Sequence, residues 1–334
     1  MVLICRPSGQ RWPTPPPLPR PMAAVSLPAA RRDPVAWELA RVPTSADPEV
    51  ARRFCRAVAA AHYENFTVAS LLVPRRLRQH LANVYTFARW ADDLADESAT
   101  PAAAAAALAD WRRELTACFA GRPAHPVFIA LADTITETGL TIDPFADLLD
   151  AFEQDQRKPR YASRTELLDY CRRSADPVGR IVLALEGCRD PDLIRMSDSI
   201  CTGLQLVNFW QDITRDRLAG RIYLPADDMK RHHVDEEMLA TAVAGPPLRA
   251  LLADEVSWAR EHFTAGAPLV TAAPRVLRPA ISLFLAGGRA VADAIEAAGF
   301  DTLVRRPTVG RLAKLRLVAG AGWAAAVSRL GGPA

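Results

Sequence analysis

Several features are scarce in this sequence, beginning with lysine. Of the 41 basic residues, only Lys158, Lys230 and Lys314 are lysines, and the net charge is only +3. The arginines are interspersed with acidic residues, so no basic face predicts binding to DNA or RNA. No apolar run reaches the roughly 18 residues that a membrane-spanning helix needs, and the longest one near the end, 317–327, is interrupted by glycine. We therefore expect a cytoplasmic protein, with peripheral membrane contact left open.

Cysteine pairs, strand patterns and nucleotide motifs are also missing. The six cysteines are scattered with no CxxC pair, which predicts reduced, mostly buried thiols. No glycine-rich phosphate loop and no dinucleotide fingerprint occur, and alternating strand patterns are essentially absent. These absences leave a helical protein as the expectation.

The first 45 residues differ from the rest. The stretch 11–21 is dense in proline, and no acidic residue precedes Asp33, which predicts a disordered or polyproline-like tail without a catalytic role. A start codon assigned too early, with Met22 as the true start, is an open alternative. From 46 to 334 the pattern predicts a single all-α domain. The helical segments are 47–62, 76–97, 102–119, 125–138, 143–156, 164–173, 176–187, 191–217, 246–264, 275–298 and 307–329.

The segment YTFARWADDLADE, 85–97, places charges among apolar residues. On a helix, Tyr85, Arg89, Asp92 and Asp96 are spaced 4, 3 and 4 residues apart and form one stripe. This stripe is either a solvated flank, where Arg89 pairs with Asp92 or Asp93, or a ligand-binding face.

A second segment, 204–225, favours ligand binding. Gln205, Asn208, Asp212 and Asp216 are spaced 3, 4 and 4 residues apart, and Asn and Asp are poor helix formers for a solvated face. Carboxylates buried together repel one another unless cations neutralise them. Magnesium prefers carboxylate oxygens and bridges to phosphates. Two facing aspartate pairs therefore predict a clamp for a small magnesium cluster that holds a diphosphate.

These two segments carry a resemblance to a known family. DDLADE (92–97) and NFWQDITRD (208–216) resemble the two aspartate-rich motifs of the squalene and phytoene synthase family. The resemblance runs from about His62 to Lys314. Longer stretches resemble the bacterial hydroxysqualene synthase branch: HYENFTVASLLVPRRLR (62–78), RYASRTELLDYCRRSADPVGR (160–180), QLVNFWQD (205–212) and GRIYLP (220–225).

The resemblance implies an all-α isoprenoid synthase fold around a central cavity, with two or three Mg²⁺ ions and carbocation chemistry. By matching position, it implies magnesium ligands or their close support at Asp92, Asp93, Asp96, Asn208, Asp212 and Asp216. It implies diphosphate contacts from Tyr85, Arg89, Arg215 and Arg221, and a cavity lined by Gln205 and Phe66. For Arg215, a local pair with Asp212 or Asp216 is an equal alternative.

Aromatic residues lie beside both motifs, and a carbocation needs a dry, aromatic-rich pocket. For Phe66, Phe87, Trp90 and Trp210, however, core packing is the first expectation. The acidic and histidine residues that follow Pro225, at 227–233, are expected in a solvated loop.

Two positions depart from the family pattern. Arg173 stands where squalene and phytoene synthases often carry a tyrosine, and Gly288 stands where many relatives carry a cavity tyrosine. Both departures suit an enzyme that begins from presqualene diphosphate and ends with water capture of the rearranged cation.

Three functions compete. The first is a hydroxysqualene synthase, which converts presqualene diphosphate and water into hydroxysqualene and diphosphate on the way to hopanoids. It would need no NADPH and would work beside a presqualene diphosphate synthase. The second is condensation of two prenyl diphosphates to presqualene diphosphate, squalene or phytoene. The third is a non-catalytic scaffold, which the two intact aspartate pairs disfavour.

Overall fold

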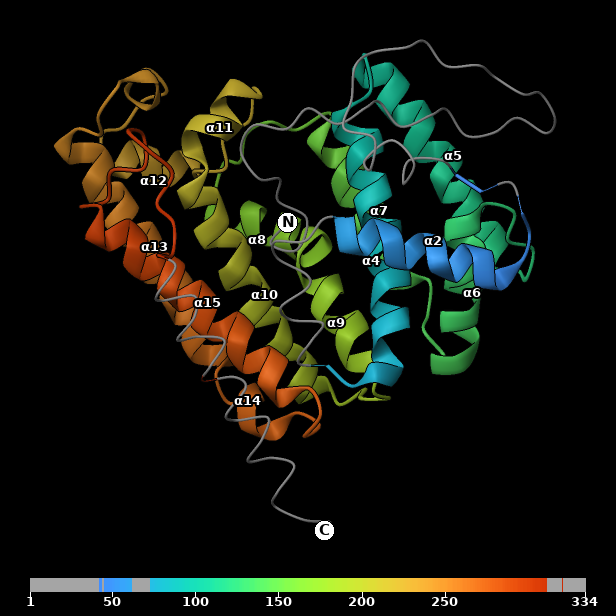
Figure 1. Cartoon of the computed structure of the whole chain (residues 1–334). Coiled ribbons are helices and arrows are strands. Elements are labelled where there is room, and N and C mark those ends of the chain that lie inside the picture. The colour runs from blue at the N-terminus through green and yellow to red at the C-terminus, as the bar shows by residue number, and fades with distance from the viewer. Residues whose placement is uncertain (1–41, 44, 62–72, 311–319, 321–334) are drawn as a thin grey trace. The chain divides into compact units, whose positions relative to one another are not determined.

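The computed structural model describes residues 42–43, 45–61, 73–310 and 320. Within these residues the secondary structure is helical and contains no strand, which confirms the all-α prediction (Figure 1). The described residues group into two compact units, an N-terminal unit (45–61 and 74–156) and a C-terminal unit (157–310). The single domain over 46–334 stays a prediction. Phe66 and nearly all of the proposed tail lie outside the described residues.

Five helices of the N-terminal unit lie among the described residues. They are α2 (Pro48–Ala61), α4 (Arg75–Asp96), α5 (Pro101–Phe119), α6 (Pro126–Thr138) and α7 (Asp143–Asp155). Local sequence signals set several of their ends. The Thr100 hydroxyl caps α5 by accepting from the Ala103 N–H, and Gly139 ends α6 in the left-handed region, at φ 63°.

An aromatic core holds this unit together on one side of α4. Phe87 is fully buried, and its ring centroid lies 6.1 Å from Trp111, 5.9 Å from Phe128 and 5.2 Å from Phe145. Trp90 stacks on Trp111 at 6.1 Å. Core packing, the first expectation for Phe87 and Trp90, is therefore what the structure has.

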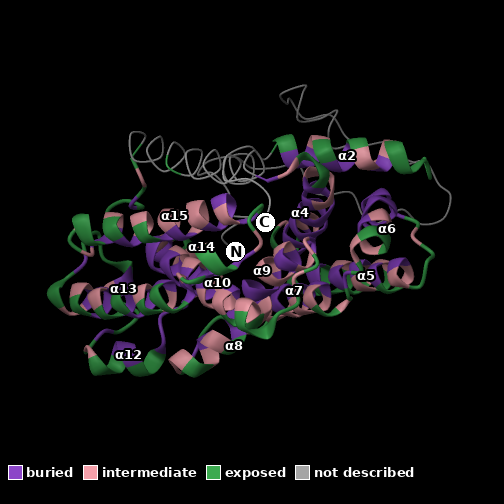
Figure 2. Ribbon diagram, turned by 90° about the horizontal axis from the view of Figure 1, so that it is seen from below, coloured by how far each residue is buried: buried purple, intermediate pink, exposed green. Residues whose placement is uncertain are grey.

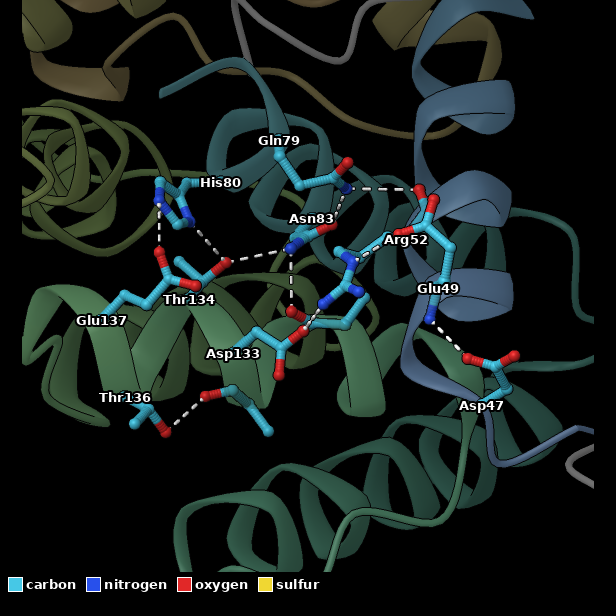
Figure 3. Close-up of polar contacts among 12 residues, drawn as sticks. Asp47, Glu49, Arg52, Gln79, His80, Asn83, Asp133, Thr134, Thr136 and Glu137 are labelled. Atoms are coloured by element: carbon cyan, nitrogen blue, oxygen red, sulfur yellow. Dashed lines mark hydrogen bonds and ion pairs between the residues drawn. The ribbon is translucent and has the colours of Figure 1, made fainter. Parts of the chain in front are cut away.

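Polar contacts join α2, α4 and α6 on another side (Figure 3). Asn83 donates to the Ala130 carbonyl at 2.8 Å and to the Thr134 hydroxyl at 3.0 Å, and Gln79 donates to Asn83 at 2.7 Å. Arg52 of α2 pairs with Asp133 of α6 at 2.5 Å. These bonds fix the rotation of α4 about its axis, and so fix which face presents the first aspartate motif.

The other helices of the described residues belong to the C-terminal unit. They are α8 (Arg164–Ser174), α9 (Asp176–Ala184), α10 (Pro191–Gln211), α11 (Ile213–Leu218), α12 (Ala226–Arg231), η1 (Met238–Ala240), α13 (Pro246–Gly266), α14 (Leu269–Ala272) and α15 (Arg278–Ala297). Helix α10 packs against α9, α13 and α15, and buried residues predominate along α4 and α10 (Figure 2). Helix α10 is thus the central element of its unit.

Three sequence predictions are corrected. The helix expected over 191–217 breaks at Asp212, which has φ −108° and ψ 15° and separates α10 from α11. The expected loop after Pro225 begins with helix α12, because Pro225 is the residue before a helix start rather than a break. Of the helix expected over 307–329, residues 307–310 are not helical, and the remainder apart from 320 lies outside the described residues.

Candidate active site

The first aspartate motif lies on the C-terminal half of α4. Its stripe is buried rather than solvated: Tyr85 is 6% exposed, Arg89 2% and Asp92 6%. Arg89 pairs with Asp93 at 2.5 Å and with Asp92 at 3.4 Å. The local pairing considered for a solvated flank is therefore present, but it lies inside the protein.

Burial changes the protonation of this stripe. It raises the pKa of Asp92 well above its ordinary value, with a further contribution from the Asp96 charge. Burial also raises the pKa of the Tyr85 phenol, which keeps that group protonated at neutral pH. Asp96 itself is exposed at the last turn of α4. The stripe therefore runs from a buried phenol to an exposed carboxylate.

The second motif lies at the end of α10. Gln205 is 1% exposed, Asn208 is half-buried and Asp212 is 4% exposed. The Asp212 N–H still donates to the Asn208 carbonyl at 3.0 Å, so the helical stripe continues to the residue where α10 ends.

Arg306 neutralises this motif from a distant part of the chain. Its Nε donates to Asp212 Oδ1 at 2.5 Å, its Nη2 donates to Oδ2 at 3.0 Å, and Nη2 also reaches Asn208 Oδ1 at 3.4 Å. The segment that carries Arg306 is fixed by Gln211, which donates to the Pro307 carbonyl, and by Arg249, which donates to Asp301 at 2.9 Å. Sequence reasoning missed Arg306, because a separation of 94 residues leaves no local signal.

Asp216 lies beyond the helix break, on α11, and is half-buried. Burial, together with the Asp212 charge, raises the pKa of Asp216 to about 8. Arg215 is exposed and Arg221 is half-buried, and both lower that pKa electrostatically. The Arg221 N–H donates to the Asp216 carbonyl at 2.8 Å. Both arginines thus lie near Asp216, and their contact with a diphosphate stays a prediction.

An aromatic cluster that the sequence did not predict includes Phe209, the residue that follows Asn208 on α10. Phe209 stacks on Tyr223 with centroids 3.9 Å apart, and Tyr170 lies 6.1 Å from Phe209 and 5.8 Å from Tyr223. Tyr161 completes it at 5.4 Å from Tyr170. Electron-rich ring faces of this kind attract cations. Trp210, by contrast, is fully buried and donates its indole N–H to the Glu255 carbonyl, so it is a core residue.

The two departures from the family pattern have physical explanations. A Cβ at Gly288 would come within 2.5 Å of the Phe263 ring and 2.7 Å of Leu204, so α15 packs closely against α10 and α13. Phe263 fills the space into which a side chain at 288 would point. Arg173 pairs with Asp169 along α8 at 2.5 Å.

The carboxylates of both motifs fit a hard divalent cation. Burial and mutual repulsion disfavour the ionised forms of Asp92 and Asp216, and a bound cation reverses that preference. In the described part of the chain, no three His, Cys, Asp or Glu side chains are grouped as a ready-made metal site. Magnesium does not need one, because it commonly takes one or two carboxylates and completes its shell with water and phosphate oxygens.

Of the two acidic residues that follow Pro225, Asp227 is exposed as expected, whereas Asp228 has a structural role. Asp228 is 2% exposed, not solvated as expected, because it pairs with Arg164 at 2.7 Å and with Arg231. The His232 ring contacts Asp254 at 2.9 Å. Partners of opposite charge satisfy this region without a metal.

No helix among the described residues is long and apolar enough to cross a membrane. A surface groove of about 580 Å³ between α5 and α7 contains Arg112 and Arg113. Both arginines pair with nearby acids, namely Glu153 and Asp110. Neither of these two arginines therefore offers an uncompensated charge.

The helices have the arrangement of the isoprenoid synthase fold. The crystal structure of squalene synthase HpnC from Alicyclobacillus acidocaldarius matches with a TM-score of 0.73 and 41% identity, over 76% of this chain and 95% of that one. A dehydrosqualene synthase in complex with a ligand matches with a TM-score of 0.75 and 25% identity, over 83% of this chain and 98% of that one.

The family follows from a further match. Residues 59–313 match the squalene/phytoene synthase family model, and the chain belongs to this family of enzymes, which act on prenyl diphosphates. Phytoene synthase of Arthrospira platensis is 30% identical over 76% of this chain and 87% of its own length. Hydroxysqualene synthase of Zymomonas mobilis is 40% identical over 56% of this chain and 63% of its own length.

Proposed function

We propose that this enzyme is a hydroxysqualene synthase, which converts presqualene diphosphate and water into hydroxysqualene and diphosphate. The observation that carries the proposal is the pair of buried aspartate motifs, whose carboxylates fit magnesium and whose neighbouring arginines fit diphosphate. The choice within the family is supported by similarity, because the hydroxysqualene synthase of Zymomonas mobilis is 40% identical over 190 residues.

Each motif has a role in this proposal. In the first motif Asp92 and Asp96 would hold magnesium, and in the second Asn208, Asp212 and Asp216 would do so. The bound cation would supply neutralising charge for the departing diphosphate. Asp93 supports the first set by holding Arg89.

The remaining predicted residues orient and enclose the substrate. Arg215 and Arg221 lie near Asp216 and bind diphosphate oxygens, for which guanidinium groups have matching geometry. Tyr85 donates from its protonated phenol. Gln205 and the Tyr170, Phe209 and Tyr223 cluster enclose the hydrocarbon and exclude water, while the ring faces stabilise the carbocation.

Two further expectations belong to this proposal. No NADPH is required, since water rather than hydride ends the reaction. A separate presqualene diphosphate synthase supplies the substrate, and the oily product favours peripheral membrane contact.

A second candidate is condensation of two prenyl diphosphates. The observation in its favour is the 30% identity to phytoene synthases, which extends over 268 and 309 residues, more than the 190 residues matched by the hydroxysqualene synthase. The Gly288 and Phe263 packing weighs against it, because the cavity tyrosine of many relatives has no room here.

The test is incubation of the purified protein with Mg²⁺ and either presqualene diphosphate or farnesyl diphosphate, without NADPH, followed by mass spectrometry of the products. We expect hydroxysqualene from presqualene diphosphate and no product from farnesyl diphosphate. Presqualene diphosphate or a hydrocarbon formed from farnesyl diphosphate would instead establish the second candidate. If the protein converts neither substrate, the result would favour the non-catalytic scaffold hypothesis.

A further inference from the structure

A buried carboxyl group that the proposed reaction has not yet used lies at the start of α9. Asp176 is 6% exposed, and its Oδ1 accepts a hydrogen bond from the Thr202 hydroxyl at 2.9 Å. A carboxyl group removed from water and bonded to one neutral hydroxyl is costly to keep. Its position therefore calls for an explanation beyond stability.

Thr202 links Asp176 to the candidate active site. Thr202, Gln205, Asn208 and Asp212 follow one another along α10 at spacings of 3, 3 and 4 residues, so they share one face. At 1.5 Å per residue, Thr202 lies about 15 Å from Asp212 along the helix axis. Asp176 thus lies at the end of the polar stripe opposite the proposed magnesium ligands.

The corner around Asp176 is rigid. A Cβ at Gly179, one turn further along α9, would come within 2.3 Å of Ser197 and 2.7 Å of Cys201 on α10. This close approach locks α9 onto α10 and fixes Asp176 against Thr202.

The same corner has unused hydrogen-bonding capacity. Ser174, two residues before Asp176, is 1% exposed, and its hydroxyl has no hydrogen-bond partner within the described residues. Buried hydroxyls are nearly always bonded, commonly to an ordered water. A hydroxyl, a carboxyl and a threonine in one buried corner suit a single water molecule.

The neighbouring charges leave Asp176 available as a base. Arg180 is engaged by Asp198 through bonds of 3.0 and 2.8 Å. Burial and the Asp198 charge raise the pKa of Asp176 to about 8, against smaller lowering effects of Thr202, Arg180 and Arg172. A base with a pKa near the working pH is well suited to general-base catalysis.

We propose that Asp176 is the catalytic base that activates the water molecule capturing the carbocation, with Thr202 and Ser174 as positioning residues. This inference rests on the proposed function. The water oxygen forms a C–O bond with the cationic carbon, one water O–H bond breaks, and its proton passes to a carboxylate oxygen of Asp176. Without this step the cation loses a proton from an adjacent carbon, and the product is a hydrocarbon instead of an alcohol.

The test measures the ratio of alcohol to hydrocarbon formed from presqualene diphosphate and Mg²⁺, together with diphosphate release. Asp176→Asn keeps the volume and the acceptor for Thr202 but cannot accept the proton, so the ratio should fall on the order of 10²-fold. Diphosphate release should change little, because ionisation precedes capture. A purely structural Asp176 would leave the ratio unchanged, since the link to Thr202 is retained.

Two further variants keep the inference falsifiable if Asp176→Asn folds poorly. Thr202→Val should lower the ratio by a smaller factor, because it removes the positioning bond but leaves the base. Asp192→Asn is the control, because Asp192 is an exposed carboxyl group at the start of α10 that pairs with Arg195. It should leave the ratio at the wild-type value. The ratio is insensitive to the folded fraction of a preparation.

The outcomes separate the two proposals. Suppose that wild-type enzyme produces alcohol. An unchanged ratio in Asp176→Asn, or a fall in Asp192→Asn as large as that in Asp176→Asn, then overturns the role of Asp176 alone. Wild-type enzyme that releases diphosphate but forms no alcohol overturns the proposed function and this inference together.

Discussion

The two aspartate motifs have similar sequences but are neutralised differently. In the first, Asp92 and Asp93 pair with Arg89 on the same uninterrupted helix, three and four residues away. In the second, Asp212 pairs with Arg306, 94 residues further along, at a point where the helix breaks. Local spacing therefore explains the charge pairing of the first motif. The pairing of the second motif depends on tertiary structure, which brings Arg306 to the end of α10.

Removing a single carboxylate from either motif should have the largest effect on the reaction rate. Asp92→Asn and Asp212→Asn should each lower the rate of diphosphate release by roughly 10²- to 10³-fold, as for other losses of transition-state charge stabilisation. Steady-state assays with presqualene diphosphate measure this. Their stabilities should differ, because only Asp212→Asn leaves a distant arginine without its carboxylate. A metal-free melting temperature that falls equally for both would contradict the comparison.

The second-largest expected effect is a loss of stability where α15 packs against α10 and α13. Gly288→Ala places a methyl group against the Phe263 ring, and overpacking of this kind costs about 1–3 kcal/mol. Urea unfolding should show this loss, and the double variant with Phe263→Leu should recover part of it. Gly287→Ala is the control, because its Cβ would meet nothing within 4 Å. Equal losses at both glycines would show that the helix, and not the contact, is responsible.

Variants of Arg306 test whether Mg²⁺ can take the place of the guanidinium group at the second motif. Arg306→Ala leaves the buried Asp212 uncompensated and should lower metal-free stability by about 1–2 kcal/mol, reduced from a fully buried pair because Arg306 is partly exposed. Addition of Mg²⁺ should then raise the melting temperature more than in wild type. Arg306→Lys keeps the charge and should show a smaller gain. An identical Mg²⁺ response in all three proteins would separate Arg306 from the metal site.

The pH dependence of metal-free stability gives a further test of the second motif. Asp216 has a pKa raised to about 8 from 3.8, so the folded protein holds a proton that the unfolded chain releases. Its contribution to stability is fully present below the ordinary pKa and is lost as the pH rises through about 8. Urea unfolding between pH 4 and pH 8 should therefore show a shallower decline for Asp216→Asn than for wild type. A steeper decline would reverse the assigned sign.

Much of the fold followed from local patterns. Apolar periodicity placed most helices within a few residues, because this pattern is set by residues one or two turns apart. The two wrong predictions of helix boundaries arise because local patterns carry no information about tertiary contacts. The break at Asp212 occurs in a segment that reads as continuous helix, and α12 follows a proline that was interpreted as a break.

Only the local parts of the candidate site could be predicted from the sequence. The stripes on α4 and α10 could be recognised because residues spaced three or four apart share a face. Arg306, Thr202 and the Tyr170, Phe209 and Tyr223 cluster were not assembled, since their contacts join distant segments. The magnesium and substrate roles stay predictions.

The sequence alone determined the helical class, the two motifs and the family resemblance, because helix formation and side-chain spacing are properties of neighbouring residues. Only the tertiary structure decided that the stripes are buried, that Arg306 neutralises Asp212 and that Asp176 bonds to Thr202. Burial and long-range pairing depend on which helix faces meet, and that is set by packing of the whole unit rather than by any single segment.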